Sequence, residues 1–167
     1  PVWLDIPMDI QSKKVNVQEL KKYRKSIKKD KQVYDIESLL ESSKRPVILA
    51  GNGIKLSNAE KNLENFLEKT KIPLVTTFLA ADVVGCEKSY NIGRVGVKGS
   101  RAGNFVMQNA DLLIVIGSRL SVPVTGYIYE NFAREAKIVV VDIDPNEHQK
   151  NTVRIDRFIK EDANEFL

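Results

Sequence analysis

The sequence is poor in the residues that most often carry metal sites and nucleophilic catalysis: its 167 residues include one cysteine, Cys86, and one histidine, His148. A single cysteine excludes a disulfide within the chain, and one residue of each type argues against a zinc site. We interpret Cys86 as a small, partly buried thiol. A mechanism that needs a histidine base would have to use His148, which follows Asp144 and Pro145 in a polar stretch typical of a helix start. The chain therefore shows no evident catalytic residue.

Long hydrophobic runs are also missing. No apolar stretch approaches the roughly 20 residues of a transmembrane helix, and no segment resembles a signal peptide. With 43% apolar residues, the chain is expected to form one domain with a real core. We predict a cytoplasmic protein with no membrane partner.

Basic charge is unevenly distributed. Residues 12–31 contain nine lysines and arginines against Glu19 and Asp30, with Tyr23 as the only aromatic residue. A nucleic-acid-binding arm would be expected to interleave basic and aromatic residues on one face. We interpret residues 12–31 as a solvated linker and predict no nucleic-acid partner, with a nucleic-acid-binding arm as the alternative.

Apolar runs alternate with stretches of helical periodicity. Strands are predicted at residues 2–6, 47–50, 72–77, 111–117, 137–144 and 152–155. Helices are predicted at residues 34–42 with Asp35 as cap, from a Ser57 or Asn58 cap through Leu67 with Ser57 and Glu60 as a capping box, at residues 102–110 and 127–136, and from Lys160 onward. This order predicts an α/β fold: an open, doubly wound, Rossmann-like parallel sheet of about six strands with helices on both faces. Residues 78–100 have little periodicity and are predicted to form a glycine-rich loop.

Ligands of such sheets bind at the carboxyl ends of the strands. Glycines after a strand let backbone N–H groups approach a phosphate, arginine can grip a phosphate with two hydrogen bonds, and an acid can accept hydrogen bonds from a ribose. The residues at these positions are Gly51, Asn52 and Gly53; Thr77, Phe78 and Leu79; the loop from Gly93 to Gly99; Gly117, Ser118 and Arg119; and Asp142 and Asp144. Together they predict a dinucleotide site.

Each of these features also has a purely structural explanation. Leu56 stands where a Rossmann fingerprint has its third glycine, so the first turn could be only a tight corner. Arg119 could form a surface ion pair, and Asp142 and Asp144 could cap the helix that starts at Pro145. A free-standing dinucleotide-binding module, akin to electron-transfer flavoproteins or sirtuin-like domains, is a further alternative.

Seven segments resemble a known family in order and spacing: "PVWLDIPMDIQ", "RPVILAGNGI", "IPLVTT", "GRVGVKG", "ADLLIVIGSRL", "VTG" and "KIVVVDIDPNE". They are similar to the end of the first domain and the whole central domain of thiamine-diphosphate-dependent enzymes. The nearest resemblance is to the large subunit of acetolactate (acetohydroxyacid) synthase. By this resemblance residues 1–11 end a pyrimidine-binding domain, residues 12–31 are a basic linker, and residues 32–167 are the central domain.

The resemblance implies a parent enzyme that decarboxylates a 2-keto acid and transfers the acyl unit. Its thiamine diphosphate and magnesium would be bound by domains outside this chain, so the chain alone is not expected to be catalytic. The central domain would hold FAD or another adenine nucleotide. Its partners would be the other domains of the parent and further copies, in a dimer or tetramer.

The positions that contact FAD in the family also carry over to this chain. They are Gly51, Asn52 and Gly53; Thr77, Phe78 and Leu79; Gly96, Lys98 and Gly99 within residues 96–99; Arg119; and Asp142, Ile143 and Asp144. Two segments depart from the family pattern. Val97 and Lys98 replace Met-His, and residues 120–123 read Leu-Ser-Val-Pro where Phe-Asp-Asp-Arg is usual. A related decarboxylase or carboligase whose central domain binds another nucleotide, or none, is therefore the alternative.

Overall fold

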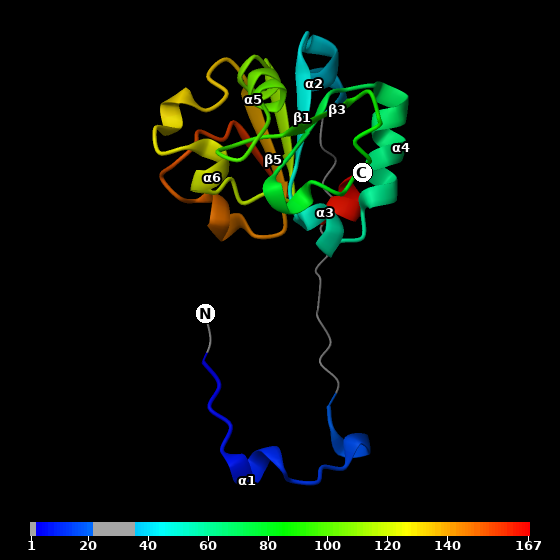
Figure 1. Cartoon of the computed structure of the whole chain (residues 1–167), viewed down its shortest axis with the longest axis vertical. Coiled ribbons are helices and arrows are strands. Elements are labelled where there is room, and N and C mark those ends of the chain that lie inside the picture. The colour runs from blue at the N-terminus through cyan, green and yellow to red at the C-terminus, as the bar shows by residue number, and fades with distance from the viewer. Residues whose placement is uncertain (1–2, 22–35) are drawn as a thin grey trace. The chain divides into compact units, whose positions relative to one another are not determined.

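The computed structural model describes residues 3–21 and 36–167 (Figure 1). The chain divides into two units, Pro1–Val33 and Tyr34–Leu167. The first contains helix α1 (Met8–Gln11) and the 3-10 turn η1 (Val17–Glu19), with no buried residue in either. The strand predicted at residues 2–6 is wrong for residues 3–6, which are irregular and pair with no strand among the residues that the structure describes, and Val2 lies outside these residues. Residues 22–31 of the predicted linker also lie outside them.

The second unit is built on a parallel sheet of six strands in the order β3-β2-β1-β4-β5-β6. The prediction of an open parallel α/β sheet is confirmed. The strands are β1 (Pro46–Ala50), β2 (Leu74–Thr76), β3 (Asn91–Arg94), β4 (Leu112–Ile116), β5 (Lys137–Asp142) and β6 (Arg157–Lys160).

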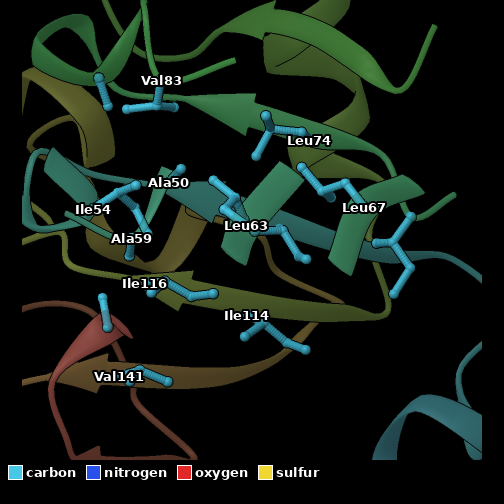
Figure 2. Packing of buried hydrophobic residues seen from close by; sticks show 14 of the residues in the cluster. Ala50, Ile54, Ala59, Leu63, Leu67, Leu74, Val83, Ile114, Ile116 and Val141 are labelled. Atoms are coloured by element: carbon cyan, nitrogen blue, oxygen red, sulfur yellow. The ribbon is translucent and has the colours of Figure 1, made fainter. Parts of the chain in front are cut away.

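Both faces of the sheet are buried, which explains the unbroken apolar runs of the central strands. Along β1, Ile48 and Ala50 belong to the core on one face, while Val47 and Leu49 belong to the core on the other. The first face is covered by α2 (Glu37–Ser42), α3 (Gly53–Leu56), α4 (Glu60–Thr70) and α7 (Ala163–Phe166), and the second by α5 (Arg101–Gln108). Figure 1 shows α4 and α5 on opposite sides of the sheet, and Figure 2 shows Leu63 and Leu67 of α4 packed among side chains of the strands.

The helix after β1 is divided, and the predicted capping box is wrong. Ser57 closes α3, because its hydroxyl donates to the carbonyl of Ile54 at 3.0 Å. Asn58 then takes a left-handed conformation (φ 55°), and α4 begins after Ala59, which makes no side-chain cap. The chain makes a corner where periodicity alone predicts one helix start. The predicted cap Asp35 of α2 lies outside the described residues.

The helix predicted at residues 127–136 is also wrong. These residues form the turn η3 (Tyr129–Asn131) and an irregular loop, preceded by the short helix α6 (Val122–Thr125). Phe132, Ala133 and Ala136 are buried with a spacing that imitates a helix. Ala133 instead has a φ of 43°, and its N–H donates to the side chain of Gln108.

Two edge strands differ from the prediction. β3 lies inside the segment predicted as a loop, and β6 lies at residues 157–160, beyond the predicted 152–155. β3 contains a glycine and a polar residue, Gly93 and Asn91, and β6 is bounded by Arg157 and Lys160, so neither is a continuous apolar run. Cys86, interpreted as partly buried, is exposed.

Asp111 joins the start of β4 to the loop before β1. Its carboxylate accepts hydrogen bonds from the Ser43 hydroxyl and from the N–H groups of Lys44 and Arg45, the latter two at 2.8 and 2.9 Å. Burial raises the pKa of Asp111, but these hydrogen bonds outweigh it and bring the pKa down from 3.8 to about 2.

We expect Asp111→Asn to destabilise the domain at neutral pH by about 1–2 kcal/mol, less than the full pKa shift implies because solvent reaches the group. Since the pKa of Asp111 is lower in the folded state, its stabilising contribution is fully present above pH 3.8 and is lost as the pH falls toward 2. Urea unfolding of both proteins at pH 7 and near pH 2.5 measures it, and the difference should shrink at the lower pH. Asp82→Asn is the control: Asp82 pairs with Lys55 but its side chain is 73% exposed, so its loss should matter far less. An equal effect of both variants would contradict this account.

Candidate functional site

The sheet reverses its strand order between β1 and β4, so the loops that follow these strands leave in opposite directions. In open parallel sheets this point forms the ligand crevice. Here the two loops are in direct contact. The N–H of Gly51 donates to the carbonyl of Ile116 at 2.8 Å, and the N–H of Gly53 donates to that of Gly117 at 2.9 Å.

Glycine is required for this contact. A Cβ on Gly51 would lie 2.2 Å from the carbonyl oxygen of Gly117, and one on Gly53 would lie 2.5 Å from the Gly117 Cα. Gly117 itself has a φ of 62°. The turn at residues 51–53 is thus a tight corner, and the N–H groups of Gly51 and Gly53 are already used within the protein. A phosphate near it would need other donors.

The loop after β2 places apolar side chains at the same edge of the sheet. The N–H of Thr77 donates to the carbonyl of Ala50 at 2.9 Å, which holds Thr77 beside the end of β1. Thr77 is buried, whereas Phe78 and Leu79, in the turn η2 (Phe78–Ala80), are 59% and 64% exposed. The guanidinium of Arg94 lies 5.9 Å from the centre of the Phe78 ring.

The loop after β3 is tied to the loop after β4. The N–H of Val97 donates to the carbonyl of Pro123 at 2.9 Å, and a Cβ on Gly96 would lie 2.2 Å from that oxygen. Gly99 closes the turn by donating to the carbonyl of Gly96 at 2.9 Å. Lys98 is exposed and makes no ion pair within the described part of the chain. Pro123 therefore serves here as a backbone acceptor.

Arg119 follows β4 and has an exposed side chain (70%) whose Nε lies 3.4 Å from the Glu147 carboxylate. Glu147 also pairs with Lys150 and belongs to the turn η4 (Pro145–His148), which follows β5. Exposed pairs of this kind contribute little free energy, so the guanidinium can exchange its partner for a ligand at small cost.

The acids after β5 are engaged within the protein. Asp142 accepts a hydrogen bond from the N–H of Asp144 at 3.0 Å, and its other oxygen lies 3.5 Å from Nε2 of His148. The His148 side chain is 3% exposed, its ring packs against Phe158, and its Nε2 has no closer partner. Burial raises the pKa of Asp142, but His148 and the surrounding N–H groups more than offset this, so the pKa lies below its ordinary value. Asp144 caps η4 by accepting from the N–H of Asn146 at 2.9 Å, one of the structural explanations considered for it.

Large apolar side chains are exposed in the segments that follow the strands at this edge. They come from the loops after β1, β2, β3, β4 and β5, and we call them the apolar rim: Leu56, Phe78, Leu79, Val97, Tyr127, Ile128 and Ile143, each 56–85% exposed. Exposed apolar residues that form a contiguous patch mark a ligand or protein contact. Sequence reasoning missed Leu56 of α3 and the loop residues Tyr127 and Ile128, although an apolar residue in a loop was the available signal for the latter two.

The structure thus brings all the predicted site residues to the carboxyl edge of one sheet, on five consecutive crossover loops. It does not bring their functional groups into one enclosed pocket. Two recesses lie elsewhere, one lined by residues of the loops before β5 and β6 and one by residues before β1, β4 and β5. Residues 3–21 and 36–167 contain no cluster of three His, Cys, Asp or Glu residues that could hold a metal ion. No helix in these residues is long and apolar enough to cross a membrane.

Comparison with known proteins points to a single family. Residues 33–167 match the family model described as "Thiamine pyrophosphate enzyme, central domain". The chain is 38% identical to the probable acetolactate synthase large subunit of Methanocaldococcus jannaschii, over 100% of the chain and 29% of that protein. It is 36% identical to the probable acetolactate synthase large subunit of Methanococcus aeolicus, over 98% of the chain and 28% of that protein.

A bacterial relative shows the same partial coverage. The chain is 32% identical to the acetolactate synthase isozyme 2 large subunit of Escherichia coli, over 90% of the chain and 28% of that protein. The chain therefore spans less than a third of the length of the relatives it matches.

Proposed function

The chain belongs to the thiamine pyrophosphate enzyme family, whose central domain it contains, and we propose that it holds FAD or another adenine nucleotide within an acetolactate-synthase-like enzyme. The parent enzyme would decarboxylate a 2-keto acid and transfer the acyl unit to an acceptor. The observation that carries the proposal is the convergence of five loops at one sheet edge, with an exposed arginine beside an apolar rim.

The rim residues suit the two chemical parts of such a ligand. Phe78, Leu79 and Val97 offer exposed apolar surface on which a flat ring system can pack. Arg119, and Lys98 on the loop after β3, supply exposed positive charge for a pyrophosphate. Glycines 51 and 53 shape the corner between these groups but do not offer their own N–H groups.

We place thiamine diphosphate and magnesium outside this chain, because its described residues do not fit a magnesium site. Magnesium takes oxygen ligands, usually one or two carboxylates with phosphate oxygens, and the part of the chain that the structure describes holds no acidic cluster for it. The two acids after β5 are occupied by His148 and by the start of η4. These cofactors would be bound by other domains, and this chain by itself would have no turnover.

The apolar rim also supports the proposal that other domains or other copies of the same protein contact this edge. Unpaired apolar side chains that are 56–85% exposed are stabilised when another domain or subunit covers them. We propose that other domains of the parent, and further copies in a dimer or tetramer, cover the part of the rim that the nucleotide leaves free.

Titration with FAD tests the nucleotide proposal. Since FAD would bind the folded domain and not the unfolded chain, it should raise the melting temperature, by an amount that grows with its concentration. Arg119→Gln should weaken binding about tenfold, the loss expected for one charge-assisted contact. Lys69→Gln, on the exposed surface of α4, removes the same charge away from the rim and should leave the affinity unchanged.

A related enzyme with another nucleotide is the second candidate. It is favoured by residues 120–123, which read Leu-Ser-Val-Pro and carry no charge. The same titration with ADP and NAD separates the two. Binding of ADP without tighter binding of FAD would support the second candidate. If none of the three nucleotides binds, the domain would serve as a structural spacer.

A further inference from the structure

The turn η4, which follows β5, is held in place at both of its ends. At its start, the Asp144 carboxylate accepts a hydrogen bond from the N–H of Asn146 at 2.9 Å. At its end, the His148 side chain is buried, and the centre of its ring lies 5.3 Å from that of Phe158 in β6. Glu147, which lies between these two anchors, is therefore carried by a fixed turn at the edge of the sheet where the candidate site lies.

The Glu147 carboxylate faces two cations. It lies 3.4 Å from Nε of Arg119, which follows the neighbouring strand β4, and it also pairs with Lys150. Its side chain is less exposed than that of either partner. A hydrogen bond from Lys150 lowers the pKa of Glu147 more than burial raises it, and the charge of Arg119 lowers the pKa further. The carboxylate is therefore charged at neutral pH.

A carboxylate and a phosphate group bind a guanidinium in the same way. Both accept hydrogen bonds from its N–H groups, and the arginine fork matches either anion. Glu147 therefore occupies part of the surface of Arg119 that a ligand phosphate would need. Two cations and one carboxylate leave one net positive charge at this place, where removal of the carboxylate would leave two. A ligand with phosphates must displace Glu147 or bind beside it.

We propose that Glu147 is an affinity-determining residue of the candidate site, because it competes with the phosphates of the ligand for Arg119. The inference rests on the proposed function, since it concerns the same nucleotide at the same edge. Because η4 is part of the folded domain, the competing carboxylate is present at every ligand concentration. It weakens the hold on the phosphates and leaves the hold on the adenosine part unchanged.

Glu147→Gln tests the competition by calorimetry on the whole chain. The variant keeps the size of the side chain but removes its charge. ADP, which carries the adenosine and the two phosphates of FAD, should bind the variant about threefold more tightly at low salt. The gain should vanish in 1 M salt, where the screening length is about 3 Å. Adenosine, which has no phosphate, should bind both proteins equally. Glu41→Gln removes an exposed acid of α2 instead and should leave the affinity for ADP unchanged.

A double variant shows whether the effect depends on Arg119. In an Arg119→Gln background, Glu147→Gln should bring little gain, because the residue for which the two anions compete is gone. The proposal is overturned if Glu147→Gln leaves ADP binding unchanged, if adenosine gains as much as ADP, or if the gain is as large without Arg119. In each of these cases ADP still binds, so the proposed function stands. If neither the wild type nor Glu147→Gln binds ADP or FAD, the proposed function fails, and this inference fails with it.

Discussion

Replacing Gly51 with alanine is expected to destabilise the domain by about 3 kcal/mol or more, a large part of the stability of a small domain. The added Cβ would lie 2.2 Å from the carbonyl oxygen of Gly117 and 2.6 Å from the Cα of Ser118. Both neighbours are backbone atoms, so no side chain can rotate away. Relief would require the loops after β1 and β4 to separate, which breaks the hydrogen bonds between the Gly51 and Gly53 N–H groups and the β4 side.

Gly126→Ala is the matched control. Gly126 has a φ of 76°, which disfavours alanine, but a Cβ there meets no atom within 4 Å. It should cost only the conformational strain of about 1–2 kcal/mol. Urea unfolding followed by circular dichroism measures both variants. If Gly51→Ala were no worse than Gly126→Ala, the two loops would not be in contact in solution, and the crevice would be open to a ligand.

This comparison bears directly on nucleotide binding. In a Rossmann fingerprint the glycines leave N–H groups facing a pyrophosphate, whereas here the same glycines let two protein loops touch. A nucleotide would then rest against the outside of the closed corner, on Phe78, Leu79 and Arg119. The absence of the third glycine, with the 80% exposed Leu56 in its place, is consistent with that arrangement.

The central strands could be predicted because burial on both faces forces every residue to be apolar. β1, β4 and β5 were found this way, since alternate residues feed two separate cores. The edge strands β3 and β6 lack that constraint. Their strand structure depends on pairing with β2 and β5, which no local pattern encodes.

The location of the candidate site was predictable from topology, but its contacts were not. Parallel strands put their following loops at one edge whatever their sequence, so Asn52, Phe78 and Arg119 had to share it. The engagement of Asp142 by His148 depends on how η4 folds back over β5, and the ion pair of Arg119 with Glu147 joins two loops. Such pairings depend on the backbone geometry of the loops, which the periodicity of apolar residues does not predict.

Leu63→Ala should also lower the free energy of unfolding strongly. The expected loss is about 3 kcal/mol, within the usual range for truncating a buried leucine. Leu63 is fully buried and packs from α4 onto the face of the sheet that carries Ile48, Leu74 and Ile116 (Figure 2). Removing three carbons leaves a cavity that a helix fixed on rigid strands fills poorly. Urea midpoints should fall while the slope of the transition stays constant, because the surface exposed on unfolding barely changes.

Leu56→Ala gives the matched comparison within the same segment, because Leu56 of α3 is 80% exposed. If the apolar rim faces solvent in the isolated chain, removing the Leu56 side chain should change the free energy of unfolding by no more than about 0.5 kcal/mol. A loss close to that of Leu63→Ala would contradict this, since it would mean that Leu56 is buried in solution. If another copy of the chain buries it, the loss of stability would depend on protein concentration.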